Sequence, residues 1–343
     1  MQDMQNVSTD SVKMAKLKEL LYNISRCDVF CDDRGESSDV PLWSTFHTKI
    51  QVDNQITVST VAFNPIIMAP PTDYSTVYTT LKRMKECINA LGQTYAPVYF
   101  DMGLLTKALE ITWTKPTDMT GIIPCEGGMH LLMAVFAGIG HLYGDAGLRE
   151  LLFESDVFAV GSVQQILSGK DFDKALRAFK LVDEALSIRF LIQFKRWCSK
   201  NNRTFPDSIH DHLHEFLEKL SDRESDRTTI NDLVSGRLGE VVKSDLLPLL
   251  SEFREEGMSI SPTFRFWNDF LVRVMLPFKL FLSSTRLGLW DVHQYAKAEL
   301  LPLMFASNRS TYARYMSYQI LQMQFPEDVI NSFKEGLVAA KLS

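Results

Sequence analysis

The sequence is poor in cysteine, has no long hydrophobic run and carries no excess of positive charge. Its five cysteines, an odd number in 343 residues, do not form a disulfide framework, so we expect a reducing intracellular compartment. No apolar run reaches the ~18 residues that a membrane-spanning helix needs, and the polar start (1–18) does not resemble a secretory signal. The formal net charge of −6 argues against a surface that wraps duplex DNA.

What is present is the composition of an ordinary globular protein, with 45% hydrophobic and 23% charged residues. The length exceeds that of a usual single domain, so we expect two domains or one domain with a large insertion. The sequence pattern changes from mixed strands and helices to helices alone, and this change predicts a domain boundary. We therefore predict an α/β core over residues 1–160 and a mostly helical region over 161–343.

Strand patterns dominate residues 43–69. Apolar and polar side chains alternate around Phe46, Thr48 and Ile50, and again from Ile56 to Ala62, which predicts a pair of hairpin-like strands. An earlier apolar stretch, 29–31, lies between acidic residues and indicates a short first strand.

A helix and two further strands follow. Apolar residues recur every three or four positions from Val77 to Leu91, which is typical of one helix face, and Gly92 is a helix stop. Short apolar runs at 95–100 and 121–124 predict two strands that pair in parallel across a helix. The nearly uncharged segment from Met129 to Leu142 then predicts a buried helix.

Asp101 stands at the end of the predicted strand 95–100. Ligands and metals bind at the carboxyl ends of strands in α/β sheets, so this carboxylate marks where chemistry would take place. The alternative is that Asp101 only caps the helix that follows, because aspartate is a preferred N-cap residue. Both interpretations remain open at the level of sequence.

Several motifs in order resemble an uncharacterised family that occurs in many copies in animal genomes. They are the segments 92–94, 127–133, 162–163 and 167–170, then 301–306, 312–315 and 333–336, together with Asp101, Ala175, Arg177, Trp290 and His293. Proteins of this kind look like products of transposable elements, and the resemblance covers roughly residues 40–343. It implies a ribonuclease-H-like transposase core.

That resemblance implies the fold class: α+β, with a small mixed, ribonuclease-H-like sheet and flanking helices, followed by a mostly helical remainder. It also implies three carboxylates that gather two Mg²⁺ or Mn²⁺ ions. Asp101 corresponds to the second acid, and the first is one of Asp28, Asp32 and Asp33. Glu299, on a late helix, is the third. The predicted catalytic set is Asp101, Glu299 and Asp32, and the predicted metal ligands are Asp101, Asp32 and Asp28.

Nucleic-acid contact is predicted near the C-terminus. Residues 257–343 carry 9 Lys and Arg against 6 Asp and Glu, and Arg309 and Arg314 alternate with tyrosines that are able to stack on bases. Arg286 is the third predicted contact. A helix packed inward by its tyrosines is the alternative for this stretch.

The resemblance implies a transposable-element-derived protein that associates with nucleic acid, a degenerate or incomplete transposase without intact catalysis. If it is active, it is a metal-dependent nuclease or strand transferase. The predicted partner is DNA, with no membrane, and the predicted location is intracellular, nuclear if the protein binds DNA. A non-enzymatic helical scaffold for protein interactions is the alternative function.

Overall fold

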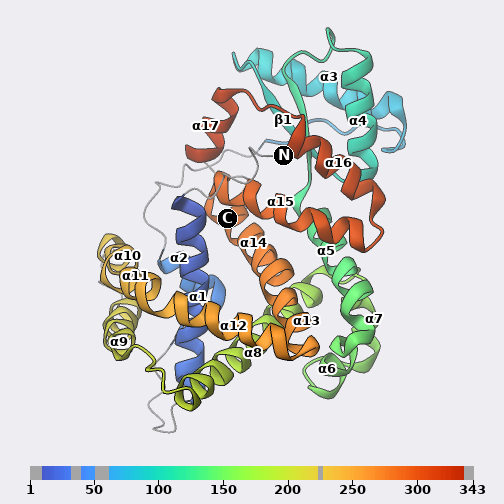
Figure 1. Cartoon of the computed structure of the whole chain (residues 1–343). Helices are drawn as coiled ribbons and strands as arrows, with labels where there is room; N and C mark the ends of the chain where they lie inside the picture. Colours follow the sequence, from blue (N-terminus) through green and yellow to red (C-terminus); the bar gives the residue numbers. More distant parts are fainter. Residues whose placement is uncertain (1–9, 32–39, 51–61, 223–226, 336–343) are drawn as a thin grey trace. The chain divides into compact units, whose positions relative to one another are not determined.

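The protein is mostly helical, as the computed structural model in Figure 1 shows. The structure describes residues 10–31, 40–50, 62–222 and 227–335. The described chain forms two compact units, each built from separate stretches of sequence. Unit 1 draws on Met1–Thr57, Leu176–Leu300 and Lys334–Ser343, and unit 2 draws on Val58–Ala175 and Leu301–Phe333. The predicted division at residue 160 is a different one and stays a prediction.

Unit 1 is all-helical in its described residues. Its elements are α1 (Asp10–Cys31), α2 (Trp43–Lys49), most of α8 (Phe172–Lys200), α9 (Asp207–Ser221), α10 (Arg227–Ser235), α11 (Arg237–Val241), η3 (Val242–Leu246), α12 (Leu247–Ile260), α13 (Pro262–Phe270), η4 (Leu271–Met275), α14 (Leu276–Leu287) and most of α15 (Trp290–Ala306). Helices α1, α2 and α14 contact one another, and α9 contacts α10 and α11.

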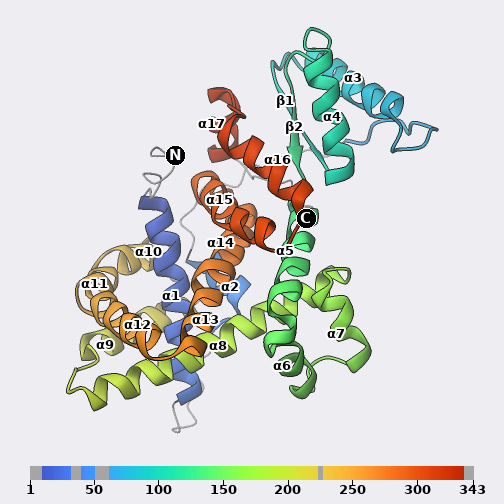
Figure 2. The same cartoon turned by 45° about the vertical axis from the view of Figure 1, so that its right-hand side comes forward.

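Unit 2 holds both strands of the described chain. Its elements are α3 (Tyr74–Ala90), β1 (Ala96–Phe100), α4 (Met102–Thr114), β2 (Ile122–Glu126), α5 (Gly128–Tyr143), η2 (Gly144–Ala146), α6 (Leu148–Glu154), α7 (Val160–Leu167), α16 (Ser310–Leu321) and α17 (Glu327–Glu335), with the adjoining ends of α8 and α15. Both α3 and α4 contact the strand pair, which Figure 2 shows beside them.

The predicted ribonuclease-H-like fold class is wrong. The described residues contain two short parallel strands, in register from Ala96 opposite Ile122 to Phe100 opposite Glu126, in place of a mixed sheet. Each strand therefore has a free edge. In β1, Ala96, Pro97 and Val98 are half-buried, Tyr99 is exposed and Phe100 is buried, so the expectation from the apolar run that both Val98 and Phe100 are buried is confirmed for Phe100 and wrong for Val98. The protein is mostly helical rather than an α+β sheet with flanking helices.

The strands predicted before residue 70 account for much of this error. Phe46, Thr48 and Ile50 belong to helix α2 and the turn after it, and the second predicted strand falls largely outside the described residues. Asp28 and its neighbours continue helix α1 instead of forming a first strand. Alternation over five residues agrees with a strand but also with one helical turn whose aromatic side chains face the core. Trp43 and Phe46 do face that core.

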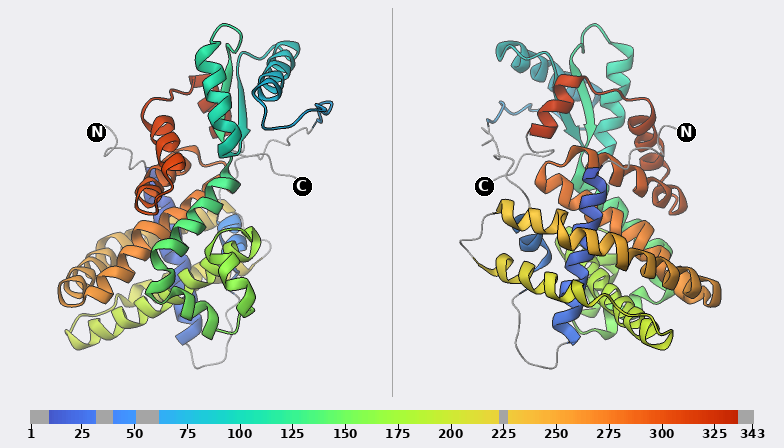
Figure 3. Two further views of the ribbon diagram at one scale, coloured as in Figure 1. Left: turned by 90° about the vertical axis from the view of Figure 1, so that its right-hand side faces the viewer. Right: turned by 60° about the vertical axis from the view of Figure 1, so that its left-hand side comes forward.

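From Tyr74 to Tyr143 the predicted elements are confirmed. Helix α3 buries Val77, Leu81 and Ile88 on one face, and both strands and their parallel pairing occur as expected. Strand β2 leads directly into α5, as Figure 3 shows. Helix α5 is buried on most of its surface because apolar residues occupy nearly every face.

Among the described helices, none alone is long and apolar enough to cross a bilayer. One bent pair, α5 with η2 followed by α6 after an 87° bend, is long and apolar enough to cross a bilayer, judged by length and composition only.

Two prolines in unit 1 follow wide turns of helix. Pro248 and Pro277 lack a backbone N–H, and their rings clash with the carbonyl four residues earlier. In each case the chain widens beforehand into a π-helical turn, Val242–Leu246 or Leu271–Met275. The bulge absorbs the lost hydrogen bond, so Pro277 lies in the first turn of α14, where no intrahelical N–H is needed.

A buried ion network ties unit 1 together. The Nζ of Lys279 on α14 lies 2.6 Å from Asp183 Oδ2 on α8 and 3.0 Å from Glu19 Oε2 on α1. All three side chains are almost completely removed from solvent. On α2, Trp43 donates its indole N–H to Glu19, and His47 Nε2 lies 3.1 Å from Glu19 Oε1.

Two ionisations follow from these contacts. Burial alone would raise the pKa of Glu19, but the charges of Lys279 and His47 outweigh it and lower the pKa to about 2. Burial likewise works against the charge of Lys279, yet Asp183 and Glu19 raise its pKa above the usual lysine range. Burial raises the pKa of Asp183, and the charge of Lys279 opposes that rise. Glu19 and Lys279 are thus charged at neutral pH, and the network holds four helices by direct contact.

Replacing Lys279 by Met leaves Glu19 and Asp183 buried without their cation. Breaking a buried ion pair by removing one partner costs about 3–5 kcal/mol, so we expect a loss of that size in the free energy of unfolding, measured by urea denaturation. Lys200→Met, at an exposed position near the end of the same α8 that carries Asp183, should change it by less than about 0.5 kcal/mol. Equal stabilities for the two variants would contradict the network's role.

The lowered pKa of Glu19 predicts acid sensitivity. A carboxyl group whose pKa is lower in the folded state stabilises the fold above its unfolded pKa, and that stabilisation is lost as pH falls through the folded value. The group's ordinary pKa is 4.5 and its folded value is about 2, so it should contribute about 3 kcal/mol that disappears from pH 5 down to pH 2.

Urea denaturation across this pH range checks the expectation. Glu19→Gln should be less stable than the wild type at neutral pH and should lose less stability on acidification. Glu240→Gln, at an exposed position, is the matched control and should follow the wild-type curve. A Glu19→Gln curve parallel to the wild type would show that Glu19 does not titrate in this range.

Candidate functional site

Two carboxylates lie at the carboxyl ends of the strands in unit 2. Asp101 directly follows β1, and Glu126, which ends β2, pairs with Phe100 across the parallel ladder. Glu126 is buried. Sequence reasoning missed Glu126, although it follows the second apolar run just as Asp101 follows the first.

Asp101 has a structural partner. Its side chain accepts a hydrogen bond from the backbone N–H of Leu104 at 2.8 Å and so caps helix α4. This is the capping interpretation that the sequence left open. The side chain therefore satisfies a free N–H of the first helical turn.

The other predicted acids lie elsewhere. Asp28 sits in unit 1 on α1, with its carboxylate 2.5 Å from Lys195 Nζ, and Glu299 is an exposed residue of α15 in unit 1. Asp32 and Asp33 lie outside the described residues. In the described parts of the chain, no group of three or more His, Cys, Asp or Glu side chains is arranged to hold a metal ion. The predicted catalytic and metal set stays a prediction without an assembled site.

Helix α16 has two faces of different character. Tyr312 points inward: its hydroxyl donates to the carbonyl of His130 at 3.2 Å, and its pKa is raised to about 12 by burial first and by the nearby Glu126 and Asp101 second. Arg309, which precedes the helix, is half-buried, with its Nε enclosed. The inward face is thus occupied with packing against the strand ends.

Helix α16 also borders a hollow of about 330 Å³ next to the end of α4. The two tyrosines of the hollow, Tyr315 and Tyr318, are half-buried and pack, like Tyr312, against the core of unit 2. Trp113 on α4 and Tyr318 on α16 meet edge to face, with ring centres 5.2 Å apart, and the indole N–H donates to the Tyr318 hydroxyl at 3.2 Å. Arg314 is exposed and lies with its guanidinium 5.5 Å from the centre of the Tyr315 ring. We call this space, with Trp113, Arg314, Tyr315 and Tyr318 on its wall, the α4–α16 hollow.

A second basic and aromatic pair lies beside the hollow. Tyr315 is close enough to Tyr74 on α3 to contribute to the raised pKa of the Tyr74 phenol, whose largest cause is its hydrogen bond to Glu110. The Nζ of Lys107 lies 5.2 Å from the centre of the Tyr74 ring. Unit 2 therefore has two cation–aromatic contacts in this region, Lys107 with Tyr74 and Arg314 with Tyr315.

The predicted nucleic-acid contacts are placed in different settings. Arg314 lines the α4–α16 hollow and Arg309 is partly enclosed, whereas Arg286 belongs to unit 1, where its guanidinium donates to the Ser44 hydroxyl at 3.0 Å. Trp113 was missed, because its place beside α16 depends on packing between helices some 200 positions apart in the chain.

The cap at Asp101 yields a direct prediction. Asp101→Ala removes an N-cap acceptor and should lower the free energy of unfolding by about 1 kcal/mol. Asp145→Ala, at an exposed position in the same unit, should cost clearly less. Calorimetric titration of the wild type with Mn²⁺ should show no site that depends on Asp101, and saturable binding lost in Asp101→Ala would restore the metal interpretation.

Comparison with known proteins identifies a family without an assigned activity. The family described as a domain of unknown function (DUF8702) matches residues 42–336. No curated protein matches the chain, and no solved structure matches it. The matched range covers most of the chain, including the strand pair, the α4–α16 hollow and two members of the buried ion network, Asp183 and Lys279, whereas Glu19 lies before it. The protein is therefore a member of the DUF8702 family.

Proposed function

We propose that the protein is a transposable-element-derived, nucleic-acid-associated protein that works by binding, without metal-dependent catalysis. The observation that carries this proposal is the α4–α16 hollow, where Trp113, Tyr315 and Tyr318 gather beside Arg314. Aromatic faces that stack on bases, next to a cation for the phosphate, are the usual means of holding single-stranded nucleic acid.

The chemistry of the hollow favours single strands over duplex. Unpaired bases expose their faces, and stacking on an aromatic side chain contributes about 1–3 kcal/mol per base. Arg314 and Lys107 supply local positive charge, although the chain as a whole carries −6. Contact then depends on a few cations rather than on a global field, so binding should be weak and sensitive to salt.

The proposal leaves out catalysis because of where the predicted catalytic acids lie. Two-metal hydrolysis needs carboxylates gathered around a common point. Asp101 is used as a helix cap, Asp28 is paired with Lys195, and Glu299 is exposed in the other unit. This distribution supports binding without strand cleavage, in an intracellular and, if the target is DNA, nuclear setting.

Fluorescence anisotropy with a labelled single-stranded oligonucleotide at low salt tests the proposal. The wild type should bind, and Trp113→Ala should weaken binding about 5- to 150-fold, as expected for the loss of one stacked base. Arg314→Glu should weaken it at least about tenfold and flatten its salt dependence. Arg149→Glu, an arginine reversal on α6 of the same unit, should bind like the wild type.

Two outcomes would contradict the proposal. Binding that survives both Trp113→Ala and Arg314→Glu would place the contact surface elsewhere. No binding at low salt would favour the alternative of a helical scaffold for protein interactions. That alternative has an observation of its own, because Phe63, Ile66 and Met68 present large apolar side chains that are 94%, 84% and 93% exposed.

A further inference from the structure

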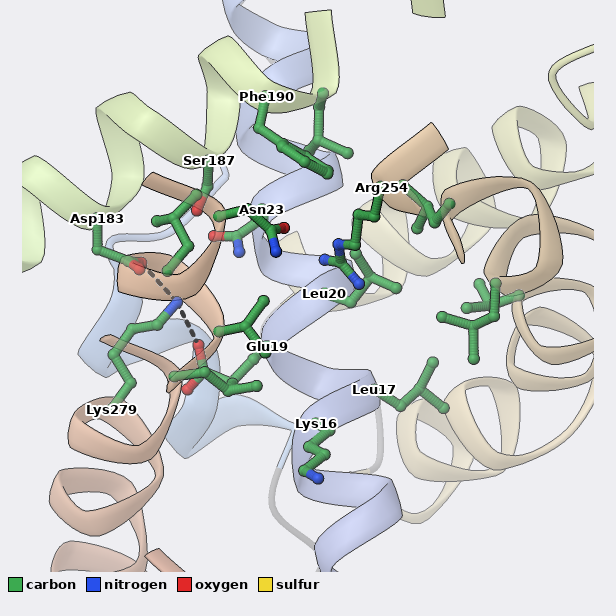
Figure 4. A pocket seen from close by; sticks show the side chains of 18 of the residues that line it. Lys16, Leu17, Glu19, Leu20, Asn23, Asp183, Ser187, Phe190, Arg254 and Lys279 are labelled. Atoms are coloured by element: carbon green, nitrogen blue, oxygen red, sulfur yellow. Dashed lines mark ion pairs between the residues drawn. The ribbon is translucent and has the colours of Figure 1, made fainter. Parts of the chain in front are cut away.

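A cavity of about 460 Å³ opens within unit 1, between α1, α8 and the segment from η3 to α14. Its volume falls in the range of about 300–1,000 Å³ that is typical of small-molecule sites. Leucine and valine side chains make up much of its wall, among them Leu17, Leu20, Leu250 and Leu276. Figure 4 shows Leu17 and Leu20 on α1 beside the space, with Arg254 reaching toward them from α12.

The charged groups at this cavity fall into two kinds. At one end, Lys279 is matched by Glu19 and Asp183, as the dashed lines in Figure 4 mark. This end has its own counter-ions, and its two carboxylates against one ammonium repel a further anion. Elsewhere on the wall, Lys13 pairs with Asp10 and Lys243 pairs with Glu240, whereas Arg254 has no such partner among the described residues.

Arg254 on α12 is a half-buried cation of this wall. Its Nε is removed from solvent and has no hydrogen-bond partner among the described residues, and its guanidinium lies 5.1 Å from the centre of the Phe190 ring. Burial lowers the pKa of Arg254, and no carboxylate in the described chain offsets that cost. A buried donor without an acceptor costs about 1–3 kcal/mol, more when it is charged, so an acceptor supplied by a ligand is strongly favoured.

A second polar group faces the same space. Asn23 Oδ1 on α1 is also buried without a hydrogen-bond partner in the described residues. A half-turn of its amide keeps the shape of the side chain and presents N–H groups in place of the oxygen. Two donors can then converge on one anion between α1 and α12.

We propose that this cavity binds an aliphatic carboxylate, with the carboxylate on Arg254 and Asn23 and the hydrocarbon chain along the leucine wall. The planar guanidinium matches a carboxylate through two parallel N–H donors, Nε and one terminal nitrogen. The hydrocarbon chain gains by leaving water for an apolar wall. The paired acids at the Lys279 end fix the orientation, because they exclude the negative head group. This binding is independent of nucleic-acid association in unit 2.

Isothermal titration calorimetry with the full chain tests this proposal. Decanoate, decanol and decyltrimethylammonium share a hydrocarbon chain and differ in head-group charge, and each is used below its micelle concentration. We expect decanoate to bind about 10- to 100-fold more tightly than decanol, as for a charge-assisted hydrogen bond, and the cation to bind least.

Three variants distinguish the cavity from other surfaces. Arg254→Gln should bring decanoate down to the affinity of decanol, whereas Arg254→Lys should keep part of the preference. Leu20→Trp fills the cavity and should abolish binding of both ligands. Arg203→Gln, an exposed arginine paired with Glu252, is the control and should bind as the wild type does. Circular dichroism confirms that each variant is folded.

The proposal is overturned by any of three results. One is the absence of decanoate binding to the wild type, and another is equal affinity for decanoate and decanol. The third is decanoate binding that persists in both Arg254→Gln and Leu20→Trp, which would place the ligand outside the cavity. If Arg254→Gln fails to fold, the proposal is still tested by the preference of Arg254→Lys for decanoate over decanol and by the loss of binding in Leu20→Trp.

Discussion

The buried ammonium of Lys279 is the constraint on which unit 1 depends. It joins α14 to α8 through Asp183 and to α1 through Glu19, three helices far apart in the sequence. Removing such charges from water costs several kcal/mol per ion, so they tolerate burial only while each keeps its partner at hydrogen-bond distance. The relative positions of the three helices are therefore restricted more sharply than leucine packing alone would require. Trp43 and His47 extend the same restriction to α2.

The complete ion network of Lys279 contrasts with nearby polar groups that lack hydrogen-bond partners in the described chain. In one cavity wall, Lys279 has two acidic partners, while Arg254 has an aromatic ring and an N–H without an acceptor. The fold therefore supplies both counter-ions for Lys279 but, among the described residues, no acceptor for the Nε–H of Arg254. The first is needed for the fold, and the second is suited to a ligand. In unit 2 the same contrast separates Asp101, used as a cap, from the exposed Arg314.

The sequence predicted unit 2 better than unit 1 because its signals there are local. The spacing of Val77, Leu81 and Ile88 defines a helix, and the apolar faces of α5 require burial. The alternation around Phe46 was misleading, since burial of aromatic residues in one turn of helix produces the same short pattern. A resemblance to transposable-element proteins then favoured a sheet that the described chain does not form.

The candidate sites were harder to predict than the elements that carry them. Asp101 was identified by its place after a strand, and its two interpretations differed only by a hydrogen bond to Leu104 that no sequence pattern reveals. Arg314 was identified from its tyrosine neighbours, but Trp113 joins it only through packing across the fold. The pairing of Glu19, Asp183 and Lys279 was not predicted for the same reason. In the sequence each is a charged residue within a helix, and such residues are usually exposed.

The proposed function depends on contact between the α4–α16 hollow and single-stranded nucleic acid. Fluorine NMR tests it most directly, with 5-fluorotryptophan in place of the chain's five tryptophans and the Trp113 resonance assigned by Trp113→Phe. On addition of a single-stranded oligonucleotide at low salt, we expect a saturable shift of the Trp113 resonance and no shift for Trp43, which is buried in unit 1. An unchanged Trp113 resonance under conditions where the oligonucleotide is bound would show that the hollow is not the contact surface.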